Sequence, residues 1–363
     1  MGRYLSVRDV DWVLLVIVLL VCAVGVLQIY SVTRDLDSHS AWWKQILYVA
    51  GGLVLMWLVL PSDYHAMLHH VPQMYVASVV GLLATFLVGE ATYGSTRWIP
   101  LGFGIHLQVS EFAKLVIILL VARYLTDLRT DQLEFREMLK LAGLVLVPVA
   151  LVLKQPDLGT AATYVVILAV GVLIAGLHWK YFAAIVLGAA LLVPVGWHFL
   201  EVYQKARLTA FFNPEEDPQG RGYHVIQSKT AIGSGGMFGK GVTKGTQSQL
   251  HFLAVPSKDF IFAAFAEEHG FVGVVVVLSL YFVMIMRIVQ NAQTAPERSG
   301  MYICMGVAAL LLSHILINVG MVAGLMPVTG IPLPFMSAGG SSIWTSFLAL
   351  GLVNNVRLRR FVN

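Results

Sequence analysis

Long apolar segments recur along the chain, and they constrain its fold more than any other feature. A helix needs roughly 20 mostly apolar residues to cross the hydrocarbon core of a bilayer. Segments of about this length cover residues 11–31, 43–61, 72–89, 107–125, 138–154, 159–177, 180–200, 259–288, 300–322 and 340–356. The sequence therefore predicts an all-α, polytopic membrane protein with about ten transmembrane helices.

Composition supports this class. Hydrophobic residues make up 58% of the 363 residues and charged residues only 12%, whereas soluble domains carry about 25% charged residues. A soluble protein this apolar could not cover its own surface. Cys22 and Cys304 both lie inside apolar segments, so they indicate neither a disulfide framework nor a metal site. The first apolar segment follows Arg3 and Arg8, and we expect it to be an uncleaved first span.

The positions of Lys and Arg near span ends predict the orientation of the chain. Basic residues gather at the N-terminus and in the segments Arg123–Lys140, Arg287–Arg298 and Arg357–Arg360. With ten spans these all fall on one side, which the positive-inside rule makes cytoplasmic. Both termini are then cytoplasmic. We expect one integral membrane domain, residues 1–363, with a large extracytoplasmic loop, 201–258, between the seventh and eighth helices.

Charged residues stand at span ends on the opposite, outward side. Glu111 and Lys114 are three residues apart and therefore share one face of a helix. Each charge lowers the cost of the other in the membrane, and such a pair serves either a structural or a functional role. Arg97 lies in the outward loop that precedes this span.

A second polar group follows the fifth span. Pro156 disfavours helix at the residue before it. Asp157 then precedes the next helix, where a carboxylate caps free backbone N–H groups and meets the positive end of the helix dipole. Capping alone explains an Asp at this position, and a functional role is the alternative.

The long outward loop holds more candidate cations. It contains Arg207, and Tyr223–Ile232 mixes apolar and polar residues in a way that predicts a short interfacial helix. A glycine-rich stretch, Ile232–Gly241, follows. It contains Lys240 and precedes Lys244, and its backbone N–H groups could approach an anion. A flexible loop is the alternative, because glycine mostly marks turns.

Asp259 is the most prominent ionisable residue of the chain. It stands at the mouth of an apolar segment, directly after Lys258, and an ionisable residue at a membrane helix is a functional candidate by default. Farther on, Asn318–Ser342 holds several prolines and glycines that preclude a continuous helix. Irregular backbone at membrane depth is tolerated where it lines a cavity, so this segment is expected to form a wall beside Asp259.

With these residues the chain resembles the SEDS family of proteins (shape, elongation, division, sporulation). The resemblance extends over essentially the whole chain. The most specific motif is Pro327-x-Thr329-Gly330-Ile331-Pro332-Leu333-Pro334-Phe335-x-Ser337-x-Gly339-Gly340-Ser341-Ser342. Supporting matches are Arg97-Trp98, Gln108-x-Ser110-Glu111-x-x-Lys114, Gln155-Pro156-Asp157-x-Gly159-Thr160 and Asp259-Phe260-Ile261-Phe262. The short termini favour the elongation member of the family over the division member.

The sequence departs from the family pattern at two places. Val109 replaces the proline of a Gln-Pro-Ser-Glu motif, which changes helix entry rather than chemistry. Ser257-Lys258 replaces the His-Thr that often precedes the aspartate, whereas Asp259 itself is retained. A family-wide role for those two positions does not carry over to this chain.

The resemblance implies an inverting glycosyltransferase of the bacterial inner membrane that polymerises lipid II, with an undecaprenyl-pyrophosphate-linked donor, into β-1,4-linked peptidoglycan strands. Its implied partner is a class B penicillin-binding protein, and no nucleic acid is implied. The acceptor hydroxyl needs a general base, and Asp259 is our candidate. Substrate binding is assigned to Arg97, Glu111, Lys114, Asp157, Arg207, Lys240 and Lys258.

Alternatives remain at this point. A divalent cation, Mg²⁺ or Mn²⁺, would stabilise the leaving pyrophosphate, with Asp259 or Asp157 as its ligand. No organic cofactor is expected. A lipid II flippase would need a polar path through the bilayer, and transporters often show matching repeats. A non-catalytic scaffold of the elongation machinery would not need Asp259.

Overall fold

The computed structural model describes residues 7–34, 40–92, 95–100, 106–128, 133–177, 221–250, 252–253 and 255–360, with residues 180, 181, 183, 187, 205, 207, 209, 211 and 212. Most of the predicted seventh span, 180–200, and the loop residues 213–220 lie outside the described residues. The fold is mostly helical, as predicted.

The helices follow most of the predicted spans. Their bounds are η1 Val7–Asp9, α1 Trp12–Thr33, α2 Ala41–Val59, α3 Tyr64–His69, α4 Val71–Val88, α5 Val109–Asp127, α6 Phe135–Lys154, α7 Leu158–Ile174, α10 Arg221–Ser234, α11 Thr246–Gln249, α12 Ile261–Gln293, α13 Arg298–Val322 and α14 Gly340–Arg359. Within the described residues, α1, α2, α4, α12 and α13 are long and apolar enough to cross a membrane. The helix predicted over Tyr223–Ile232 is confirmed by α10.

Two loops contain structure that the sequence did not indicate. The short helix α3 lies between α2 and α4, and Asp63 caps it by accepting a hydrogen bond from the backbone N–H of His65. Three short antiparallel strands, β1 Glu90–Thr92, β2 Ser95–Pro100 and β3 His106–Leu107, pair in the order β1-β2-β3 between α4 and α5. Pairing satisfies backbone groups there that a bare loop would leave to solvent.

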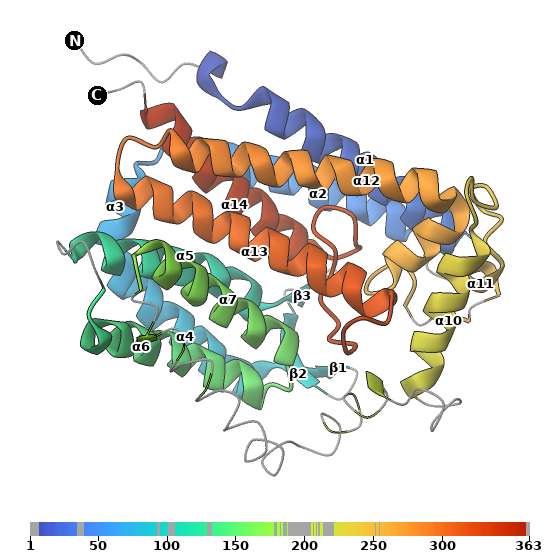
Figure 1. The fold of residues 1–363 in the computed structure, drawn as a ribbon, viewed down its shortest axis with the longest axis horizontal. Helices are drawn as coiled ribbons and strands as arrows, with labels where there is room; N and C mark the ends of the chain where they lie inside the picture. The colour runs from blue at the N-terminus through green and yellow to red at the C-terminus, as the bar shows by residue number, and fades with distance from the viewer. Residues whose placement is uncertain are drawn as a thin grey trace.

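The two ends of the described chain lie close together, at the start of α1 and the end of α14 (Figure 1). They lie at one end of the molecule, whereas α10 and α11 lie at the other. At the terminal end Asp11 is 1% exposed and caps α1 through Leu14. Its carboxylate also binds Arg287 of α12 at 2.7 Å and Arg357 of α14 at 3.3 Å. This buried network joins three helices far apart in sequence.

The helix α12 is kinked, and the glycine-rich stretch packs into the kink. Gly270 has φ 65° and ψ −166° within α12, a left-handed φ that glycine adopts without steric cost. The backbone N–H groups freed there donate to the stretch, from Phe271 to Gly236 O at 2.8 Å and from Val272 to Met237 O at 3.1 Å. The glycine-rich stretch is therefore anchored to α12.

Candidate functional site

Asp259 lies directly before α12, beside the Pro- and Gly-rich loop that joins α13 to α14. Its main-chain carbonyl accepts a hydrogen bond from Asn318 Nδ2 at 3.0 Å, and the same amide donates to Ile331 O at 2.7 Å. A Cβ placed on Gly330 would lie 3.4 Å from Asp259 Oδ2. The loop therefore forms a wall beside this carboxylate, as the sequence predicts.

Ser337 makes a second link between the loop and the segment that carries Asp259. Its hydroxyl donates to Lys258 O at 2.8 Å and accepts from Leu333 N–H at 2.8 Å. The backbone N–H of Ala338 donates to Ser257 O at 2.8 Å. Residues 257–259 are thus held at three consecutive carbonyls, which fixes where the Asp259 side chain begins.

The surroundings of Asp259 favour its neutral form. Asp259 as a whole is half-buried. Burial raises its pKa above the ordinary 3.8, and the positive charges of Lys258 and Arg207 oppose that rise. Asp157 adds to the rise and Arg97 opposes it. A carboxylate whose pKa lies closer to neutrality is better matched to accepting a proton near the operating pH.

Arg97 binds the turn between α6 and α7. Its Nε donates to Gln155 O at 2.8 Å, its Nη2 donates to Pro156 O, and its Nη1 lies 3.4 Å from Asp157 Oδ2. The planar guanidinium group suits this set of acceptors in a way that a lysine amine does not. Gln155 is itself held by donating to Thr85 Oγ1 at 2.5 Å.

Asp157 caps α7, as predicted, and also joins other elements. Its Oδ1 accepts from Thr160 N–H at 3.0 Å, and its Oδ2 accepts from Gln108 Nε2 at 3.1 Å. A cap of this kind typically contributes about 1 kcal/mol to helix stability. A Cβ on Gly159 would lie 2.6 Å from Ile331 Cγ1. The start of α7 therefore lies against the loop that flanks Asp259.

Glu111 and Lys114 form a buried ion pair, with Lys114 Nζ 2.6 Å from Glu111 Oε1 and side-chain exposures of 5% and 2%. His314 of α13 lies 3.2 Å from Lys114 Nζ through Nε2. The His314 ring also lies near the main chain of Pro332. The pair is thereby joined through one imidazole to the loop beside Asp259.

Lys240 belongs to a different polar cluster. Its Nζ lies 2.7 Å from Glu267 Oε1 on α12, and the Glu267 side chain is fully buried. The backbone N–H groups of Gln247 and Ser248 also donate to this carboxylate, at 3.0 and 3.3 Å. In the glycine-rich stretch itself, the N–H groups of Lys240 and Gly241 donate to the main-chain carbonyls of Glu267 and Glu268, and whether the stretch approaches an external anion stays a prediction.

The structure brings four of the predicted substrate-binding residues to the surroundings of Asp259. Lys258 precedes it, Arg207 Nη1 lies 3.5 Å from Thr329 O, and Arg97 and Asp157 meet at the start of α7. Glu111 and Lys114 are linked toward the same loop through His314, whereas Lys240 binds Glu267 on α12. The role of all seven predicted residues in binding substrate stays a prediction.

Three residues that organise the site were given no role of their own from the sequence: Asn318 and Ser337, which were named only as parts of a segment and a motif, and His314. Asn318 and His314 are four residues apart on α13, so they share a helix face, and both are buried. Polar side chains of this kind inside an apolar helix are the signal that could have marked them.

The residues at the site do not fit a metal held by protein alone. Both oxygens of Asp157 already accept hydrogen bonds from protein groups, and Arg97 lies 3.4 Å from one of them, so a cation bound at Asp157 would compete with these contacts. Within the described part of the chain, no group of three or more His, Cys, Asp or Glu side chains could hold a metal ion.

Comparison with known proteins places the chain among cell-wall proteins. The model of the FtsW/RodA/SpoVE family, described as "Cell cycle protein", matches residues 11–360. The peptidoglycan glycosyltransferase RodA of Treponema pallidum is 34% identical, covering 99% of this chain and 100% of that protein. The peptidoglycan glycosyltransferase MrdB of Escherichia coli K12 is 36% identical, covering 96% of this chain and 94% of that protein.

Solved structures show the same fold. A peptidoglycan synthase complex that coordinates polymerization and crosslinking contains a chain with TM-score 0.85 and 31% identity, covering 98% of this chain and 99% of that one. The rod shape determining protein RodA of Thermus thermophilus aligns with TM-score 0.73 and 29% identity, covering 98% of both chains.

Proposed function

Because the chain belongs to the FtsW/RodA/SpoVE family, we propose that it is a peptidoglycan glycosyltransferase that polymerises lipid II during cell elongation. The observation that carries this proposal is the position of Asp259. Its carboxylate lies beside the loop between α13 and α14, with Arg207, Lys258 and Arg97 close enough to influence its pKa.

Asp259 acts as the general base in the proposed reaction. The acceptor is a sugar hydroxyl of an incoming lipid II, and the donor is a glycan linked through its reducing sugar to undecaprenyl pyrophosphate. Asp259 takes the hydroxyl proton as the acceptor oxygen attacks the anomeric carbon. The bond from that carbon to the pyrophosphate oxygen breaks, and the pyrophosphate leaves with the electron pair. Inversion at the carbon gives a β-1,4 linkage.

Positive charges stabilise the leaving pyrophosphate. Arg97, Arg207 and Lys258 are the candidates, and their charges act more strongly in a partly buried site than in water. A divalent cation, Mg²⁺ or Mn²⁺, remains a proposal. The single free carboxylate of Asp259 would hold Mg²⁺ only together with substrate phosphates, which is a common arrangement for that ion.

The orientation of the chain follows from its basic segments. We propose ten spans in one membrane domain, with both termini in the cytoplasm and residues 201–258 as the large extracytoplasmic loop. The termini lie at one end of the molecule and α10 and α11 of this loop lie at the other (Figure 1). Because Asp259 directly follows the loop in sequence, this arrangement supports an active site on the extracytoplasmic face. That face is where a substrate already carried across the membrane would be used.

A class B penicillin-binding protein is the proposed partner. The similarity to a chain of a peptidoglycan synthase complex over 98% of this chain supports this proposal. Such a partner would crosslink the glycan that this chain makes.

The function is tested with fluorescent lipid II in liposomes that contain the full chain and its penicillin-binding partner, with crosslinking blocked. Long glycan strands are the expected product. If lipid II crosses the bilayer and no glycan forms, the protein is a flippase. If neither polymer nor translocation occurs in correctly assembled preparations of the complex, the protein is a non-catalytic scaffold.

A further inference from the structure

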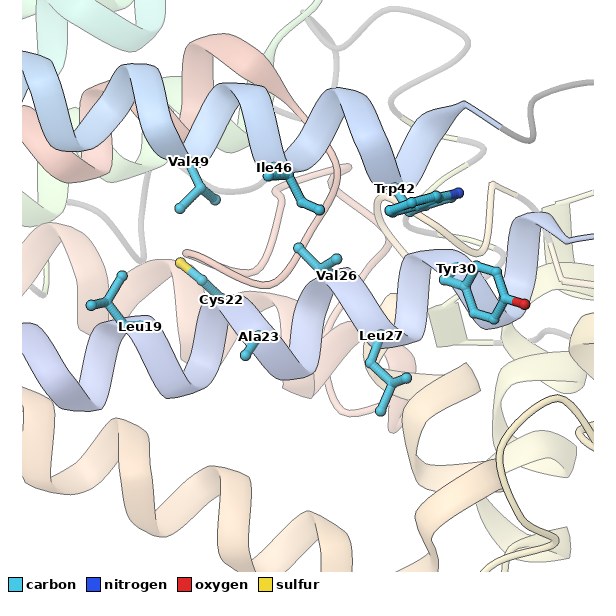
Figure 2. A pocket seen from close by; sticks show the side chains of 9 residues that line it. All are labelled: Leu19, Cys22, Ala23, Val26, Leu27, Tyr30, Trp42, Ile46 and Val49. Carbon is cyan, nitrogen blue, oxygen red and sulfur yellow. The ribbon is translucent and has the colours of Figure 1, made fainter.

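An apolar groove runs between α1 and α2 (Figure 2). Its volume is about 580 Å³. The lining side chains come from both helices: Leu19, Cys22, Ala23, Val26, Leu27, Tyr30, Trp42, Ile46 and Val49. Almost every atom that lines the groove is apolar, so it suits a hydrocarbon ligand and offers little to a polar one.

The groove has a closed floor and open sides. Cys22 at the floor is only 3% exposed, whereas Leu27 and Ile46 at the sides are 45% and 36% exposed. Cys22 and Ala23 are small, which leaves room between the two helices. A flexible chain could therefore enter sideways from the bilayer.

One end of the groove has an interfacial character. Tyr30 and Trp42 meet there edge to face, with ring centroids 6.0 Å apart. Their amphipathic rings are typical of the headgroup level of a membrane. Tyr30 is near the end of α1 and Trp42 near the start of α2, so this is the end of the helices away from the chain termini.

The groove is also joined to the loop that flanks Asp259. Gln45, the residue before Ile46, donates to Ser337 O at 3.0 Å and accepts from Gly339 N–H at 3.3 Å. On α1, a Cβ at Gly25 would lie 2.6 Å from Met336 O. Ser337 in turn donates to Lys258 O. Two hydrogen bonds therefore connect α2, at the residue next to the lining residue Ile46, to the residue before Asp259.

We propose that this groove binds the polyprenyl chain of a lipid-linked substrate, with the pyrophosphate end toward Tyr30 and Trp42. The inference rests on the proposed function, since it assigns a binding site to that substrate. Continuity with the Asp259 loop favours a polyprenyl chain over a bulk phospholipid, which would need no link to the site.

Photo-crosslinking tests the proposal without requiring polymerisation. The full chain is reconstituted in phosphatidylglycerol liposomes with undecaprenyl pyrophosphate that carries a diazirine on its hydrocarbon chain, and labelled peptides are mapped. We expect label in residues 19–30 and 42–49, suppressed by unlabelled undecaprenyl pyrophosphate but not by added phosphatidylglycerol. Label confined to other segments, or equal suppression by phosphatidylglycerol, overturns the proposal even if the enzyme polymerises lipid II.

A matched pair of variants tests the same site by kinetics. Ile46→Trp fills the groove, whereas Leu47→Trp places the same ring on a neighbouring residue that is 54% exposed and does not line it. We expect KM for lipid II to rise about tenfold in Ile46→Trp, the change expected when two methylene groups lose their burial. In Ile46→Trp, KM for an analogue with a short farnesyl chain should stay unchanged. In Leu47→Trp, KM should stay unchanged for both lipid II and the farnesyl analogue.

Other results would contradict the proposal. Equal KM changes for the long and short chains in Ile46→Trp would place the effect elsewhere, provided that thermal unfolding shows both variants folded. If the penicillin-binding partner abolished labelling of the groove while polymerisation continued, the groove would be a docking face for a partner helix.

Discussion

The side-chain amide of Asn318 donates to the main-chain carbonyl of Asp259 at 3.0 Å and to that of Ile331 at 2.7 Å. One residue of α13 therefore sets the distance between the candidate base and the loop beside it. The two carbonyls belong to segments more than 70 residues apart in sequence. The bond from Asn318 acts on the backbone of Asp259, so it leaves the carboxylate free for chemistry.

Replacing Asn318 by Leu should reduce catalysis more than a comparable change elsewhere. The variant leaves two carbonyls without their donor, at a cost of about 1–3 kcal/mol for each that stays buried. A shift of Asp259 by about 1 Å would lower kcat by up to about a hundredfold. The measurement is kcat for glycan synthesis, alongside the thermal unfolding midpoint.

The control for that variant is Asn355→Leu. Asn355 is fully buried and donates to Val59 O at 2.8 Å and Ser62 O at 2.5 Å, at the opposite end from Asp259. We expect it to lower stability comparably and to leave kcat nearly unchanged. An equal fall of kcat in both variants would remove the special role of Asn318.

The acid limb of the pH–rate profile should report Asp259. A general base must be ionised, so activity falls as the pH falls through its pKa, which burial raises above the ordinary 3.8. Lys258 opposes that rise. Lys258→Gln removes the opposing charge, raises the pKa further and should move the midpoint of the acid limb to higher pH. The exposed Lys244 supplies the control, Lys244→Gln; a midpoint that stays fixed in Lys258→Gln would contradict the assignment.

Arg97→Lys should weaken the turn before α7. A lysine amine cannot reach Gln155 O, Pro156 O and Asp157 together in the geometry of a guanidinium group. Losing a hydrogen bond to a charged group costs about 1.5–3 kcal/mol, and we expect glycan synthesis to fall about tenfold or more. Arg123→Lys is the matched control, because Arg123 also donates to two carbonyls, those of Leu68 and His69. Similar activity in the two variants would count against the Arg97 assignment.

Variants of the buried pair Glu111 and Lys114 distinguish a structural role of the pair from a functional one. Lys114→Met leaves Glu111 as an uncompensated buried charge, and we expect a loss of about 3–5 kcal/mol in the free energy of unfolding. Adding Glu111→Gln should restore part of that loss. Additive losses in the double variant would show that the two side chains are not coupled. Restored stability without restored activity would assign the pair a role toward substrate.

Local patterns in the sequence were sufficient to predict those features of the site that depend on neighbouring residues. The spacing of Glu111 and Lys114 predicts a shared helix face, and their ion pair of 2.6 Å follows from it. Pro156 followed by Asp157 predicts a capped helix start, and Asp157 accepts from Thr160 N–H. These features depend on residues within one or two turns of each other.

Tertiary contacts could not be predicted in the same way. Nothing near Lys240 indicates that its amine lies on Glu267, 27 residues farther along the chain. The hydrogen bond from Asn318 to the main-chain carbonyl of Asp259 joins residues 59 apart in sequence. It depends on how α12 and α13 pack. The strands between α4 and α5 were missed because each is only two to six residues long.

The most direct test of the account is glycan synthesis by Asp259→Asn, measured in complex with the penicillin-binding partner while crosslinking is blocked. Asparagine keeps the shape of the side chain and its backbone contacts but cannot accept the proton. We predict a loss of about 10²–10⁴-fold in a variant whose unfolding midpoint matches the wild type. Equal amounts of glycan from wild type and variant would contradict the assignment of Asp259 as the base.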